Sequence, residues 1–118
     1  MTAEENKAIV RRVIEEVWNR GNLAVIDAIV AEHYVGHDPS VPMPIQGPEG
    51  FKTWVGVARN AFPDFHIDLD DLVAEGDRIA GRITMRGTHR GDLAGIPATG
   101  RQVSFGGIFI RHLEDGQF

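Results

Sequence analysis

The chain has 118 residues, of which 42% are hydrophobic and 25% are charged, proportions that predict one globular domain. A formal net charge of -5, without a basic stripe, argues against binding along nucleic-acid phosphates. The chain has no cysteine, which excludes disulfides and thiolate catalysis and fits a cytoplasmic protein. The polar N-terminus is unlike a signal peptide and no apolar run matches a membrane span, so we expect no membrane partner.

The first thirty residues predict two helices. Thr2 and Glu5 form a capping box, apolar residues recur at helical spacing over residues 9–18, and Gly21 ends this first helix. Asn22 is expected to cap a second, shorter helix. The buried face expected for that helix consists of Leu23, Ile26, Ile29 and Val30.

A loop and a third helix follow. Residues 39–48 hold four of the six prolines and predict a loop, because proline restricts both its own backbone and that of the preceding residue. Pro48 suits the first turn of the next helix, and Pro63 ends it. The inward face of that helix is expected to consist of Phe51, Trp54, Val55, Ala58, Ala61 and Phe62.

After Pro63 the apolar residues recur at every second position, which predicts strands over residues 65–73, 78–89 and 101–113. Helices followed by an antiparallel meander indicate an α+β fold whose N-terminal helices pack on one face of the sheet. Glycines inside the strands suit bends that curve the sheet strongly, and such a sheet covered by helices would enclose a ligand cavity. The last strand is apolar on both faces, which predicts a partner subunit or helices on its second side.

The segment 114–117, with sequence EDGQ, is a hairpin signal after an alternating strand. A returning strand would begin at Gln117 or Phe118, where the sequence stops. We therefore expect residues 1–118 to form a single domain that lacks its final C-terminal strand. That strand would come from further residues of the same protein or from a partner chain covering the bare edge.

Seven segments, taken in order, resemble the SnoaL-like polyketide (ester) cyclases, a branch of the nuclear-transport-factor-2-like superfamily. They are VWN at 17–19, YVGHDP at 34–39, GPEG at 47–50, AFPD at 61–64, GTHRG at 87–91, GIPATGR at 95–101 and IRHLEDG at 110–116. The resemblance implies a cone-shaped, cystatin-like barrel with an internal cavity, usually paired as a homodimer through the outer face of the sheet. It also implies intramolecular aldol-type ring closure on an apolar carbonyl compound, without a metal or an organic cofactor.

The same resemblance leaves the activity open. The aspartate credited with acid–base catalysis in these cyclases would fall beyond Phe118, and a histidine that lines their pocket corresponds to Phe109. An alternative is therefore a non-catalytic module that binds an apolar or aromatic small molecule in the same cavity. A weaker alternative is an interaction domain whose sheet pairs with another protein.

Two histidines are candidates for catalysis, because an imidazole in a dry cavity can move protons beside a carbonyl. His89 shares a strand face with apolar residues, which favours a cavity position; the alternative is a strand-end histidine that anchors the following loop. His37 lies in a Gly-His-Asp-Pro turn expected near the cavity mouth, where it could instead satisfy loop backbone. His33 lies four residues before His37, but Gly36 argues against a continuous helix there, so we expect no metal site.

The candidate ligand-binding residues are mostly aromatic, as expected for a pocket that holds a planar apolar molecule. They are Tyr34, Phe62, Gly107, Phe109 and Arg111. Arg111 is expected near the hairpin, where it would guard the entrance or reach solvent. Trp54 and Phe105 are better explained as core residues.

Overall fold

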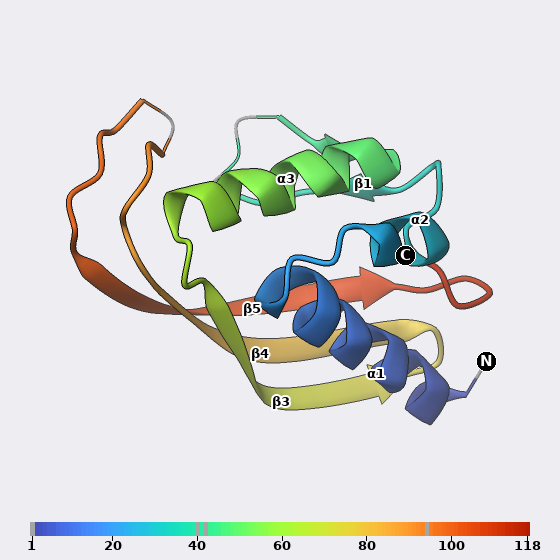
Figure 1. Cartoon of the computed structure of the whole chain (residues 1–118). Helices are drawn as coiled ribbons and strands as arrows, with labels where there is room; N and C mark the ends of the chain where they lie inside the picture. Colours follow the sequence, from blue (N-terminus) through green and yellow to red (C-terminus); the bar gives the residue numbers. More distant parts are fainter. Residues whose placement is uncertain (1, 40, 42, 94) are drawn as a thin grey trace.

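The computed structural model describes residues 2–39, 41, 43–93 and 95–118. Three helical segments cover one face of a curved antiparallel sheet, with the C-terminus beside the helices (Figure 1). This arrangement confirms the α+β class predicted from the order of the elements. The described helices and strands are, in order, α1 (Ala3–Arg12), η1 (Val13–Asn19), α2 (Ala24–Ile29), β1 (Val35–Gly36), β2 (Ile45–Gln46), α3 (Gly47–Ala61), β3 (His66–Glu75), β4 (Arg78–Thr88) and β5 (Gln102–His112). No described helix is long and apolar enough to cross a membrane.

The first helix begins and ends where the sequence predicts, but its second half is a π-helix. The Thr2 and Glu5 side chains form the predicted capping box, and Gly21, with φ of 73°, donates its N–H to the Val17 carbonyl. The apolar pattern does not reveal the wider π turn, because Val17 and Trp18 remain buried in either geometry.

The prediction for the second helix was partly wrong. Asn22 does not cap α2; Leu23 stands at the N-cap without a side-chain hydrogen bond, and its own side chain is exposed. Val25 is buried in its place, together with Ile26 and Ile29. Because α2 starts one residue later than predicted, Leu23 lies outside the helix, while Ile26, Ile29 and Val30 are buried as predicted.

Helix α3 forms as predicted and supplies the centre of the core. Pro48 lies in its first turn, and Phe51 and Val55 are completely buried. The Trp18 ring meets Phe51 and Trp54 edge-on, with centroid distances of 6.0 and 4.7 Å. Aromatic pairs in this geometry add to the stabilisation that burial alone supplies.

The described strands β3, β4 and β5 form an antiparallel sheet in that order, so β3 and β5 are its edges and the barrel is not closed. A register shift between Leu69 and Asp71 interrupts the pairing of β3 with β4. We call the face against the helices the concave face; on β4 it carries Ile79, Gly81, Ile83, Met85 and Gly87, and on β5 Val103, Phe105, Gly107, Phe109 and Arg111. We call the opposite face the outer face.

The hairpin predicted at the C-terminal end of β5 is present. Glu114 and Gln117 exchange two backbone hydrogen bonds of 2.9 Å. The central residues Asp115 and Gly116 have φ of 51° and 78°, the positive angles that a type I′ turn requires. Phe118 then donates its backbone N–H to the Ile29 carbonyl and buries its ring under the helices.

Candidate functional site

The concave face brings together six of the seven residues predicted to form the site, in two separate groups. Tyr34, Phe109 and Arg111 meet near the start of α3, whereas Phe62 and His89 meet near its end. Gly107 lies on β5 between the two groups, beside the Met85 methyl. We call the two groups the Arg111 end and the His89 end. The seventh residue, His37, is exposed on the loop after β1.

At the Arg111 end, a half-buried guanidinium stands among aromatic rings. Its central carbon lies 5.1–6.0 Å from the ring centroids of Tyr34, Phe51, Trp54, Phe109 and Phe118. Its Nη1 donates to the Tyr34 hydroxyl at 2.7 Å. Attraction between a cation and the face of each ring compensates part of the lost hydration.

Two glycines allow this packing. The Tyr34 ring folds back over Gly36, and the Phe109 ring crosses to Gly81 on the neighbouring strand, so a β-carbon at either glycine would collide with the ring. Gly81 and Phe109 are direct partners in the β4–β5 register. Backbone approach of this kind is available only where no side chain projects.

At the His89 end, a buried imidazole joins the sheet to the loop that follows β4. His89 is 7% exposed, and its Nδ1 lies 3.0 Å from the Thr99 hydroxyl. The Phe62 ring tilts against the imidazole at a centroid distance of 5.6 Å. The other imidazole nitrogen, His89 Nε2, is buried and has no hydrogen-bond partner among the described residues. An unsatisfied buried polar atom costs about 1–3 kcal/mol, which a ligand that hydrogen-bonds it would recover.

The backbone fixes His89 from both sides. The His89 N–H donates to the Arg101 carbonyl at 2.9 Å and the Gly100 N–H donates to the His89 carbonyl at 2.8 Å, which extends the β4–β5 pairing by one step. The N–H of Arg90 bonds to the Ala61 carbonyl at the end of α3. His89 therefore occupies the point where sheet, helix and loop meet.

The two ends face the same helix but are well separated. Trp54, which contacts Arg111, and Phe62, which contacts His89, are eight residues apart along α3 and its C-cap. This spacing corresponds to about 12 Å along the helix axis. The side chains of Ile83 and Met85 between the ends are only partly buried.

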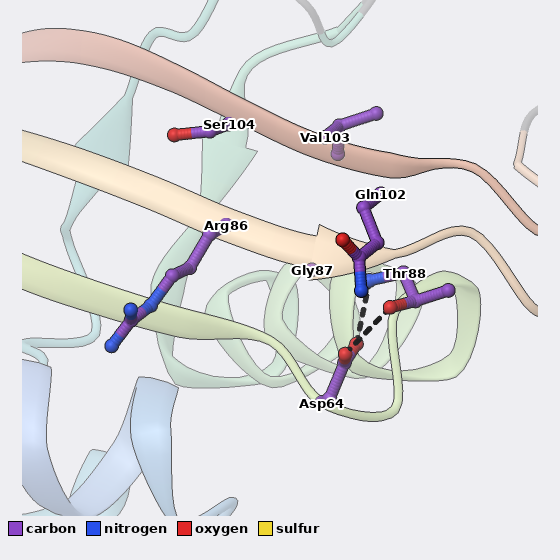
Figure 2. A pocket seen from close by; sticks show the side chains of 7 residues that line it. All are labelled: Asp64, Arg86, Gly87, Thr88, Gln102, Val103 and Ser104. Carbon is purple, nitrogen blue, oxygen red and sulfur yellow. Dashed lines mark hydrogen bonds between the residues drawn. The ribbon is translucent and has the colours of Figure 1, made fainter.

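A polar hollow of about 320 Å³ lies at the same end of the sheet as His89, around the end of β4. Asp64 and Thr88 point toward each other there, whereas Arg86 points away (Figure 2). The Asp64 carboxylate accepts from the Thr88 backbone N–H at 2.6 Å and from its hydroxyl at 2.8 Å. These hydrogen bonds lower the pKa of Asp64 below its ordinary value. Because the Asp64 carboxylate already accepts both hydrogen bonds from Thr88, we assign Asp64 a structural role and not a catalytic one.

Besides Phe51 and Trp54, which were predicted as inward-facing residues of α3, two residues at the candidate site were not predicted from the sequence. Phe118 reaches the Arg111 end through the hairpin turn, and Thr99 reaches His89 from ten positions further along the chain. Neither stands in a periodic segment, so no local pattern indicates its neighbour. Thr99 lies in the GIPATGR segment that resembles the cyclases, but the sequence analysis gave it no role.

The comparisons with known proteins agree with the fold and the motifs. The profile of the SnoaL-like polyketide cyclase family matches residues 8–118. Aklanonic acid methyl ester cyclase DauD of Streptomyces sp. (strain C5) is 28% identical over 115 residues, which cover 92% of this chain and 68% of that cyclase. The cyclase of the same description from Streptomyces peucetius, DnrD, is also 28% identical over 115 residues, covering 92% of this chain and 76% of DnrD.

Among solved structures, TsrD from Streptomyces laurentii superposes with a TM-score of 0.86 and 30% sequence identity, covering 100% of this chain and 85% of TsrD. The fold, the ordered motifs and the family profile lead to one conclusion. The chain belongs to the SnoaL-like polyketide cyclase family.

Proposed function

We propose that this protein catalyses intramolecular aldol-type ring closure on an apolar, polyketide-like carbonyl compound, without a metal or an organic cofactor. The substrate would lie in an apolar pocket along the concave face. The observation that carries the proposal is the buried His89 Nε2, which lacks a partner among the described residues, in a chain of the cyclase family. The methyl ester cyclases DauD and DnrD support the substrate class.

In this mechanism substrate binding uncovers the buried His89 Nε2, and His89 moves one proton. A neutral imidazole nitrogen removes a proton from the carbon beside a carbonyl, and the resulting enolate carbon attacks a second carbonyl of the same molecule. One C–C bond forms, the attacked carbonyl becomes an alkoxide, and the imidazolium returns the proton to that oxygen. The product is an isomer of the substrate, and no electron acceptor is consumed. Phe62 excludes water from one face of the imidazole.

His37 has a secondary place in this proposal. Its side chain is exposed on the loop after β1, which suits contact with the part of a ligand nearest the solvent rather than proton transfer in a dry site. His37→Ala should therefore change affinity more than turnover.

The test is product analysis with aklanonic acid methyl ester, the corresponding free acid and close analogues, because two relatives are named for the ester. The proposal expects a cyclised product of unchanged mass with the wild-type protein, and strongly reduced product with His89→Ala. Recovery of bound substrate unchanged after long incubation would contradict catalysis.

A non-catalytic binding module is the alternative, and one observation favours it. Among the described strand residues and their continuation to His89, the concave face carries two ionisable side chains, His89 and Arg111, and neither is a carboxylate. The alternative predicts tight binding with no chemical change. The same incubation separates the two functions.

We also propose that the protein forms a homodimer through the outer face of the sheet. Val73, Ala80 and Ile110 lie side by side in the β3–β4–β5 register, and Ile108 lies one step further along β5. The side chains of Val73, Ile108 and Ile110 are 58%, 78% and 71% exposed. They form an exposed apolar row of the kind that marks a protein–protein interface. Light scattering should give twice the mass of the 13.0 kDa chain, and Ile108→Lys should restore the monomer. A wild-type monomer would contradict this.

A cytoplasmic location stays a prediction from the cysteine-free sequence.

A further inference from the structure

The Arg111 guanidinium has hydrogen-bond donors to spare. An arginine carries five N–H donors in a rigid planar fork, and the structure gives Arg111 one side-chain partner, the Tyr34 hydroxyl. The buried side-chain atoms without partners are Asn6 Oδ1 and His89 Nε2, within the described part of the chain. Arg111 is not among them, so its unpaired nitrogens are not sealed inside the protein.

The positive charge of Arg111 also lacks a counter-ion among the described residues. None of the described carboxylates lies within ion-pairing distance of it. The surrounding rings offer only their weakly negative faces, so the cation is half removed from water without a matching anion. A planar carboxylate fits the guanidinium fork through two parallel hydrogen bonds.

We propose that the Arg111 end binds a free carboxylate carried by an elongated aromatic or apolar ligand. The guanidinium would hold the carboxylate and the aromatic rings, among them Trp54 and Phe109, would hold the adjoining ring system, which directs the rest of the molecule along α3 toward His89. This inference rests on the proposed function, since it assumes that the ligand occupies the concave face. It deepens that function by naming an acid, rather than an ester, as the preferred substrate class.

The test compares three probes of one shape, 2-naphthoate, its methyl ester and 2-naphthamide, by titration of tryptophan fluorescence. The wild-type protein should bind the carboxylate at least about tenfold more tightly than either neutral probe, as expected for charge-assisted hydrogen bonds. Arg111→Gln should abolish that preference while still binding the ester, and Arg111→Lys should keep part of it. Arg78→Gln is the matched control: Arg78 is exposed, one residue before the β4 partner of Arg111, and on the outer face. It should leave the preference intact.

The ratio of the wild-type affinities for the acid and the ester tests the carboxylate site even if a variant does not fold. Equal binding of acid and ester would overturn the carboxylate site and leave the apolar pocket of the proposed function standing. A preference that persists in Arg111→Gln would also overturn it. Failure of all three probes to bind would overturn the inference and the pocket together.

Discussion

Arg111 and His89 stand at opposite ends of one sheet face, and they differ in charge, access and attachment. Arg111 is a permanent cation whose spare donors are open, and it is held by rings from several elements. His89 is buried, and it is fixed through its own backbone and the Thr99 hydroxyl. An accessible cation suits binding, whereas a dry imidazole in a rigid position suits proton transfer. The contrast predicts that the two ends serve different steps.

The largest effect is expected at the His89 end. His89→Ala should lower kcat about 10²–10⁴-fold, the usual range for loss of a general acid–base group. Steady-state cyclisation kinetics would measure the loss. His112→Ala is the control, because His112 is exposed and pairs with Asp77 on the outer side of the sheet. If kcat of His89→Ala matched the wild-type value, His89 would have no part in the reaction.

At the Arg111 end, Gly81→Ala should lower the free energy of unfolding by about 1–3 kcal/mol, because the added methyl group overlaps the Phe109 ring. Urea denaturation would measure the change. Gly56→Ala is the control: apart from its chain neighbours and the backbone of its own helix, no described atom lies within 4 Å of the added methyl group. Gly56 is on an exposed part of α3, so this variant should gain about 0.5–1 kcal/mol. Equal stability of both variants would show that Phe109 does not rest on Gly81.

A smaller loss is expected for Tyr34→Phe. Removing the hydroxyl deletes the hydrogen bond from Arg111 but keeps the ring, so the free energy of unfolding should fall by about 0.5–1.5 kcal/mol. The freed donor should leave the preference for 2-naphthoate in place or strengthen it. Loss of that preference would mean that Tyr34, not Arg111, recognises the acid.

The smallest effect concerns Asp64, near the His89 end. Its pKa is lowered by hydrogen bonds from Thr88, so its ionised form stabilises the fold at pH values above the ordinary carboxyl pKa. That contribution is lost as the pH falls through the lowered pKa of the folded state. The Tm of Asp64→Asn should therefore lie slightly below the wild-type Tm near pH 7 and converge with it in acid. A difference that persists unchanged at low pH would contradict this origin.

The sequence predicted the elements far better than it predicted their contacts. The capping box, the end of the first helix at Gly21 and the inward face of α3 all depend on neighbours a few residues away, and all three are confirmed. Asn22 failed as a cap because a one-residue shift in a six-residue helix leaves no periodic trace.

The candidate site depends on contacts between distant residues. Tyr34 meets Arg111 across 77 positions, and the separation between the Arg111 and His89 ends follows from the register of β4 with β5. Periodicity assigns a residue to a face but not to a place along it. The sequence therefore proposed the candidate residues without revealing that most of them lie in two groups.

The most direct test of the two-ended site is a kinetic comparison of His89→Gln, Arg111→Gln and the double variant in the cyclisation assay. Our account predicts that His89→Gln lowers kcat, that Arg111→Gln raises KM for an acidic substrate, and that the two effects add within about 0.5 kcal/mol, as for residues out of contact. A fall in kcat from Arg111→Gln as large as that from His89→Gln, with no further loss in the double variant, would contradict it.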